Sequence, residues 1–100
     1  ITLNYKDGYP PVINNEKATN KLKNAAKKIV PKGIIPPYLS MGGEDFSYFL
    51  NEIPGCFFFL GSSPKDRKLF STPQHCSNYD IDEDVMLIGS SIFVELALNI

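Results

Sequence analysis

The sequence predicts an α/β fold with short strands and three helices. Apolar residues alternate with polar ones in some stretches, as in a half-buried strand, and recur every three or four positions in others, as in a helix. These stretches follow one another in the order strand, helix, helix, strand, helix, which is typical of α/β proteins. Hydrophobic residues make up 43% of the 100 residues and charged residues 21%. This balance favours one small globular core over disorder.

A strand and a long helix are predicted in the first third of the chain. Ile1, Leu3 and Tyr5 alternate with polar residues, and the two prolines that follow Tyr9 keep the next segment extended. Asn14-Asn15 offers an N-cap for a helix that ends before Pro31 and Gly33. The predicted buried face of this helix consists of Ala18, Leu22, Ala25, Ala26 and Ile29, and the solvated face of Lys17, Lys21, Lys23, Lys27 and Lys28.

A second helix is predicted after Gly42-Gly43, a pair that permits backbone geometry which other residues avoid. Glu44 and Asp45 are expected in its first turn, where carboxylates suit the exposed N–H groups. Adjacent carboxylates can also serve as acid/base groups or metal ligands, but their position fits capping better. The predicted buried stripe consists of Phe46, Phe49 and Leu50.

The last part of the chain is predicted to form a strand and a long helix. Residues 56–61 are a short apolar run between two glycines, which suits a strand covered on both faces. The final helix, residues 82–100, follows Asp80, which has capping-box spacing to Glu83. Because this helix is apolar on nearly all sides, we expect most of it to be buried, or exposed where part of a larger protein is missing.

Charge, hydropathy and cysteine content argue against binding to nucleic acids or anionic membranes, against a membrane span and against a disulfide scaffold. The net charge is −1, whereas nucleic-acid and anionic-membrane surfaces need a clear basic excess. No apolar run approaches the roughly 18–20 residues of a membrane span. Cys56 and Cys76 are too few for a disulfide scaffold, and they predict reduced thiols in a cytoplasmic protein. Because Ile1 opens a strand-like segment without an initiator Met, we expect a piece of a longer polypeptide.

His75 is the lone histidine and lies in a loop that leads into the last helix. It suits a surface position, a structural position, or one ligand of a site that is completed elsewhere. Cys76 beside it is a second soft ligand, but sequence neighbours rarely chelate one ion well, and no further Cys/His pair exists for a structural zinc site. Taken alone, these residues favour a structural role for His75.

Four motifs in order change this interpretation. They are Tyr-Pro-Pro-Val-Ile-Asn-Asn from residue 9, Met-Gly-Gly-Glu-Asp-Phe from residue 41, Pro-Gly-Cys-Phe-Phe-Phe-Leu-Gly from residue 54, and His-Cys-Ser-Asn-Tyr-Asp-Ile-Asp-Glu-Asp from residue 75. In this order and spacing, the chain resembles the C-terminal part of the zinc-dependent amidohydrolase and aminoacylase family. That family includes hippurate hydrolases, auxin-conjugate hydrolases, N-acyl-amino-acid deacylases and related carboxypeptidases. The resemblance covers nearly all of the chain.

The resemblance implies an enzyme of two domains, in which a zinc-peptidase-type α/β catalytic domain is interrupted by a ferredoxin-like lid that also mediates dimerisation. Residues 1–8 are then the last strand of the lid, and residues 9–100 are the C-terminal portion of the catalytic domain. His75 falls on the family's last metal-ligand position, ahead of the run from Tyr79 to Glu83. The flanking Cys76 departs from the small polar residues or Pro that are usual there, which hardly affects this assignment.

The resemblance also assigns roles at the second motif and a function. The backbone of Gly42 and Gly43 is expected to face the substrate, and Glu44 and Asp45 to be structural residues near the site. The parent is expected to be a homodimeric amidohydrolase or metallopeptidase that cleaves the linear amide bond of N-acyl amino acids or related peptides. Its metal is expected to be zinc, although manganese, cobalt and nickel can share such ligand sets.

The remaining metal ligands and the proton-shuttling Glu would lie upstream of Ile1. We therefore expect the isolated chain to contain no catalytic residue, to bind no metal and to be inactive. The alternative is an autonomous α/β interaction module, in which His75 is structural and the apolar last helix docks a partner.

Overall fold

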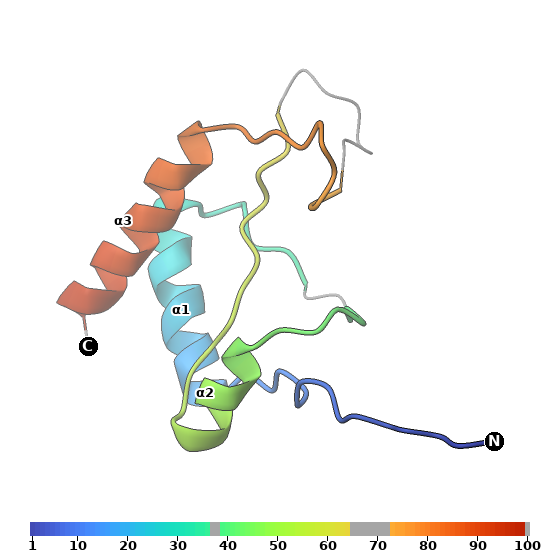
Figure 1. Cartoon of the computed structure of the whole chain (residues 1–100). Coiled ribbons are helices and arrows are strands. Elements are labelled where there is room, and N and C mark those ends of the chain that lie inside the picture. The colour runs from blue at the N-terminus through green and yellow to red at the C-terminus, as the bar shows by residue number, and fades with distance from the viewer. Residues whose placement is uncertain (37–38, 65–72, 100) are drawn as a thin grey trace. The chain divides into compact units, whose positions relative to one another are not determined.

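The structure, a computed structural model, describes residues 1–36, 39–64 and 73–99. In these ranges it contains the helices α1 (Glu16–Ile29), α2 (Phe46–Glu52) and α3 (Asp84–Leu98), which are joined by extended and turn segments (Figure 1). The chain divides into two compact units, Ile1–Phe57 and Phe58–Ile100, and each is described by itself. Among the described residues, no helix is both long and apolar enough to cross a membrane.

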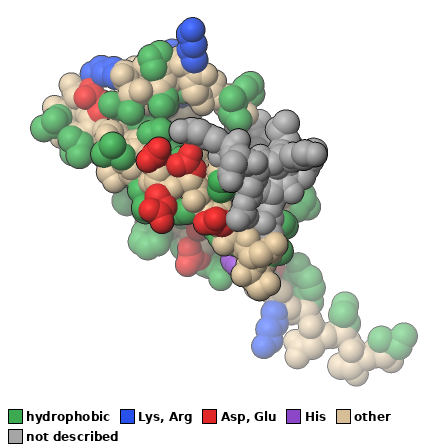
Figure 2. Space-filling model, turned by 90° about the horizontal axis from the view of Figure 1, so that it is seen from above, with side chains coloured by type: hydrophobic (Ala, Val, Ile, Leu, Met, Phe, Trp, Pro, Cys, Tyr) green, Lys and Arg blue, Asp and Glu red, His purple; other side chains and the backbone are tan. Residues whose placement is uncertain are grey.

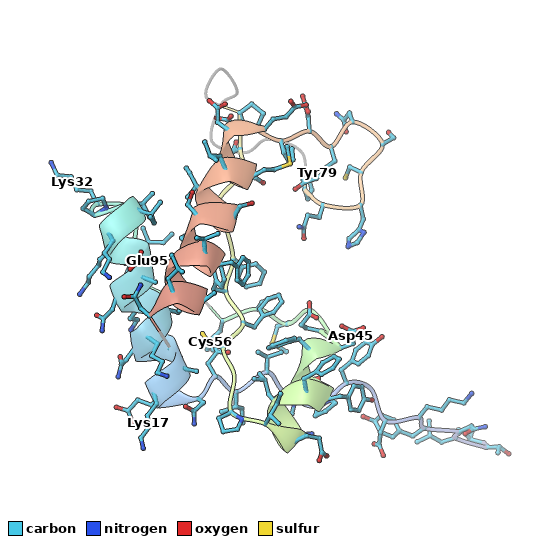
Figure 3. All side chains as sticks on the ribbon, turned by 90° about the vertical axis from the view of Figure 1, so that its left-hand side faces the viewer. Lys17, Lys32, Asp45, Cys56, Tyr79 and Glu95 are labelled. Carbon is cyan, nitrogen blue, oxygen red and sulfur yellow. The ribbon has the colours of Figure 1, made fainter. Side chains whose placement is uncertain are left out.

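Helix α1 confirms the predicted helix, its cap and its two faces. The Asn15 Oδ1 accepts a hydrogen bond from the Ala18 N–H at 3.1 Å, which satisfies one of the unpaired donors of the first turn. The buried residues are Leu22, Ala25 and Ala26. The five lysines of the opposite face are exposed, and Lys17 points away from the helix (Figure 3).

Two hydrogen bonds of the Asn14 side chain hold Phe57 at the start of α1. The Asn14 Nδ2 donates to the Phe57 carbonyl oxygen, and the Asn14 Oδ1 accepts from the Phe57 N–H, both at 2.8 Å. Next to them, the Asn15 N–H donates to the Gly55 carbonyl oxygen at 2.9 Å. These bonds satisfy the N–H and carbonyl groups of Phe57 and the carbonyl group of Gly55, which a neighbouring strand would satisfy in a sheet. The amide side chain of Asn14 thus takes the place of a strand partner at Phe57.

Helix α2 packs its aromatic side within the first unit. The Phe46 ring lies 5.7 Å from the Phe49 ring and 5.8 Å from the Phe57 ring, measured between centroids. A Cβ at Gly55 would lie 2.9 Å from the Leu50 Cδ2, so a side chain there would require the end of Leu50 to shift. The predicted buried stripe is confirmed only in part, because the Phe49 side chain is 60% exposed.

In the second unit, residues of the segment after Phe57 pack against α3. The Phe58 and Phe93 rings are 5.8 Å apart, and a Cβ at Gly89 would lie 3.0 Å from the Leu60 Cδ2. Ile92 is buried. Much of the apolar surface of α3 is nevertheless open, and hydrophobic side chains are spread over the visible face in Figure 2. The large apolar residues of α3 that are exposed are Met86, Leu87, Phe93, Val94 and Leu98.

The predicted α/β class is not confirmed, because the described residues contain no strand. Residues 1–5 are exposed and have no regular secondary structure, and the described segment 56–61 bonds to a side chain rather than to another strand. The physical reason is that a strand exists only in a ladder with a second strand, whereas alternation along one segment predicts no partner for it. The assignment of residues 1–8 to a lid stays a prediction.

The start of α3 corrects the predicted helix 82–100 and its capping box. The helix begins at Asp84, and the Glu83 side chain makes no capping bond. Instead, the Asp82 Oδ1 accepts from the Asp84 N–H at 3.1 Å, and the Asp82 N–H donates to the Ser62 carbonyl oxygen at 2.8 Å. The Asp82 backbone is bonded to Ser62, and the predicted capping box of Asp80 and Glu83 does not form.

The Asn14 hydrogen bonds can be tested by unfolding in urea. We expect Asn14→Ala to lower the free energy of unfolding by about 1–3 kcal/mol, since two hydrogen bonds of about 0.5–1.5 kcal/mol each are lost. The matched control is Asn20→Ala, which removes an exposed amide from α1 and is expected to be neutral or slightly stabilising, because alanine is the better helix former. Equal stability of the two variants would contradict the assignment.

Candidate functional site

The predicted glycine loop leads directly into α2. The Gly42 N–H donates to the Ser40 Oγ at 3.2 Å. Neither Gly42 nor Gly43 has a positive φ, so the expectation that these residues adopt a backbone geometry closed to others is wrong. Gly43 instead makes a close approach to a ring, because a Cβ there would lie 2.7 Å from the Tyr9 Cδ2 and either the ring or the backbone would have to shift. A Cβ at Gly42 would make only an ordinary contact of 3.4 Å with the Ser40 Oγ.

The two acidic residues after the loop lie just before α2. The Glu44 Oε1 accepts from the Phe46 N–H at 3.0 Å, and the Glu44 carbonyl oxygen accepts from the Ser47 Oγ at 2.6 Å. Ser47 is completely buried. Asp45 is the N-cap residue, its side chain makes no capping bond, and it lies exposed at the start of α2 (Figure 3). The predicted place of both acids in the first turn is wrong, because α2 begins at Phe46 and has no acidic residue in its first turn. The Glu44 side chain still bonds the first N–H of the helix, whereas the Asp45 side chain does not.

Tyr9 and Tyr48 border the glycine loop. Their ring centroids are 5.9 Å apart with an interplanar angle of 72°, which is the favourable edge-to-face arrangement. Tyr9 is 56% exposed and Tyr48 53% exposed, so one side of the pair faces solvent. Sequence reasoning missed this pair, since the residues are far apart along the chain. The sequence signal for this close approach is the glycine at position 43 itself.

His75 lies exposed in the turns that precede α3. Its φ of 70° makes it the one non-glycine residue with positive φ in the part of the chain that the structure describes. Next to it, the Tyr79 N–H donates to the Cys76 carbonyl oxygen at 3.0 Å, and the hydroxyls of Tyr79 and Ser62 lie 3.5 Å apart; Figure 3 shows Tyr79 in this loop. A left-handed non-glycine residue costs roughly 1–3 kcal/mol, and such residues cluster at functional sites.

The described residues do not complete a metal site around His75. They contain no group of three or more His, Cys, Asp or Glu side chains that could hold a metal ion. Two nearby carboxylates bond backbone groups: the Asp80 Oδ1 accepts from the Ile81 N–H at 2.9 Å, and the Asp82 Oδ1 accepts from the N–H of Asp84, the first residue of α3. An exposed imidazole suits the role of one ligand among several. The glycine loop and His75 belong to different units, so each is assessed alone.

Comparison with known proteins identifies the class to which these motifs belong. Residues 1–99 match the profile of peptidase family M20/M25/M40, and the chain belongs to this family. The resemblance to amidohydrolases and carboxypeptidases that the four motifs predict is therefore confirmed. No solved structure matches the chain significantly.

Three curated relatives show the range of the family. Thermostable carboxypeptidase 1 of Saccharolobus solfataricus is 36% identical over 94 residues, which cover 94% of this chain and 23% of the relative. N-acetyldiaminopimelate deacetylase of Lacticaseibacillus paracasei is 34% identical over 94 residues, with the same two coverages of 94% and 23%. IAA-amino acid hydrolase ILR1-like 2 of Arabidopsis thaliana is 31% identical over 100 residues, which cover 99% of this chain and 22% of the relative. The chain thus spans about a quarter of the length of these relatives.

The left-handed conformation at His75 predicts that glycine is more stabilising than alanine at this position. We expect His75→Gly to be more stable than His75→Ala by about 1 kcal/mol in urea unfolding of the 100-residue chain, because glycine adopts positive φ without the clash of a Cβ. The same pair of substitutions at Ser90, on an exposed face of α3, should give the opposite order. A His75→Ala variant as stable as His75→Gly would show that the turn does not require positive φ.

Proposed function

We propose that the chain is part of a metal-dependent hydrolase that cleaves the amide bond of N-acyl amino acids or related peptides. The observation that carries this proposal is the family match over residues 1–99, which includes both His75 and the glycine loop. Two of the relatives are named for acting on N-acetyldiaminopimelate and on IAA-amino acids. These names support an N-acyl amino acid as the class of substrate.

In this proposal His75 is one ligand of a divalent metal site, with zinc as the first candidate and manganese, cobalt and nickel as alternatives. When bound, the metal ions polarise the scissile carbonyl group and activate a water molecule. The exposure of the His75 imidazole supports the role of a metal ligand, because a metal ion can reach the ring without disturbing buried side chains. The turn bond between Cys76 and Tyr79 restricts the backbone that carries the imidazole. The other ligands would lie outside this chain.

The glycine loop is proposed to receive the substrate through its backbone. Residues without side chains allow a ligand to approach the peptide groups closely, and the Glu44 and Ser47 bonds fix where the loop joins α2. In the same proposal residues 1–8 end the lid domain, residues 9–100 belong to the catalytic domain, and the complete enzyme is a homodimer. An autonomous interaction module has less support, because the family match extends over residues 1–99.

The ligand role of His75 is tested in the complete protein that carries this chain. We expect His75→Ala to lower the hydrolysis of N-acetyl and N-benzoyl amino acids by more than about 100-fold, since even residues behind a metal ligand contribute 10–100-fold. Metal content, measured by elemental analysis, should fall in parallel. The control is Cys76→Ser, which changes the exposed neighbour and should keep both values. Wild-type turnover in His75→Ala would rule out the ligand role.

The isolated 100-residue chain should differ from the complete protein in metal content and in hydrolytic activity. Because one imidazole cannot hold a metal pair, we expect no stoichiometric zinc after equilibrium dialysis and no release of amino acid from the same substrates. A chelator-resistant ion at one equivalent per chain would show that this chain supplies the other ligands itself.

A further inference from the structure

We propose that Tyr9 is a positioning residue for the glycine loop: its ring fixes the backbone at Gly43 and thereby sets how tightly the substrate is held. The proposal rests on the proposed function of Gly42 and Gly43 as the loop that faces the substrate. It gives a role to Tyr9, which lies in the segment before α1 and has no role in the proposed function itself.

The contact between Tyr9 and Gly43 is closer than a side chain at position 43 would allow unless the ring or the backbone shifts. A Cβ on Gly43 would lie 2.7 Å from the Tyr9 Cδ2, 3.4 Å from the Cε2 and 3.8 Å from the Cγ. These are atoms of one edge of the ring, so the edge lies directly on the glycine backbone. Because neither glycine of the loop has a positive φ, the ring contact is the structural reason for glycine at this position.

The Tyr9 ring is also held from a second direction. It meets the Tyr48 ring edge-to-face at 5.9 Å, and the Tyr48 N–H donates to the Asp45 carbonyl oxygen at 3.0 Å at the start of α2. Tyr9 therefore contacts both the loop and the helix into which the loop leads. A ring held on both sides restricts the angle at which residues 42–45 enter α2.

An added methyl group at position 43 has two ways to fit, and both disturb the loop. Tyr9 is 56% exposed, so its ring can swing toward solvent, but it then leaves Tyr48 and releases the loop. If the ring stays, the backbone at Gly43 has to move instead. A shift of about 1 Å in a group that positions substrate can cost up to about 100-fold in rate. A nearby control is Gly8, because a Cβ there meets nothing within 4 Å.

The test is a double-mutant cycle in the complete, metal-loaded enzyme with N-acetyl and N-benzoyl amino acids as substrates. We expect Gly43→Ala to raise KM about tenfold with a much smaller change in kcat, and Gly8→Ala to change neither. Tyr9→Ala should also raise KM, and Tyr9→Phe should recover most of that loss, since the ring and not the hydroxyl makes the contact. In the Tyr9→Ala background, Gly43→Ala should add less than twofold, because the ring that it meets is gone.

Amide hydrogen exchange provides a readout that needs no substrate. In Tyr9→Ala, exchange at residues 41–45 should accelerate severalfold, while the amides of α1 keep their protection. If the wild-type enzyme hydrolyses none of the substrates, the proposed function fails and the exchange result still decides the role of Tyr9. Unchanged exchange at residues 41–45, or an equal cost of Gly43→Ala with and without the Tyr9 ring, would overturn the proposal.

Discussion

Two adjacent asparagine side chains organise the first unit, and the contacts of α2 depend on them. Asn15 caps α1, while Asn14 holds both backbone groups of Phe57. With Phe57 in this place its ring reaches Phe46, and the bond to Gly55 brings the backbone under Leu50. Each hydrogen bond stabilises by only about 0.5–1.5 kcal/mol. Their importance is positional, because they bring α2 to the start of α1.

The candidate site follows from the same arrangement. Once α2 is placed, Tyr48 can receive the Tyr9 ring, and the ring can lie on Gly43. In the second unit, the Asp82 N–H donates to the Ser62 carbonyl oxygen, and this bond holds the residues just before α3 outside the helix. Those residues form the turns in which His75 is found. In each unit, a hydrogen bond between segments that are distant in sequence thus lies next to the motif of that unit.

Sequence reasoning succeeded where the deciding interactions are local. The period of α1, its Asn15 cap and the carboxylate of Glu44 at the start of α2 involve partners within four residues. It failed where a distant partner decides. The start of α3 was misplaced because the bond from Asp82 to Ser62 is invisible in a spacing pattern, and strands were predicted without knowing what would pair with them. The motifs singled out His75, but no pattern foretells its positive φ.

The sequence separation of 43 between Asn14 and Phe57 also bears on how the first unit forms. The Asn15 cap is local, so α1 can form with its cap as soon as its own residues are available. The bonds of Asn14 require closure of a loop that contains α1 and α2, and such non-local contacts form more slowly than local ones. We therefore expect the first unit to assemble in a local stage and a later closing stage. The glycine loop lies inside the closing segment, so we expect it to reach its final position only in the later stage.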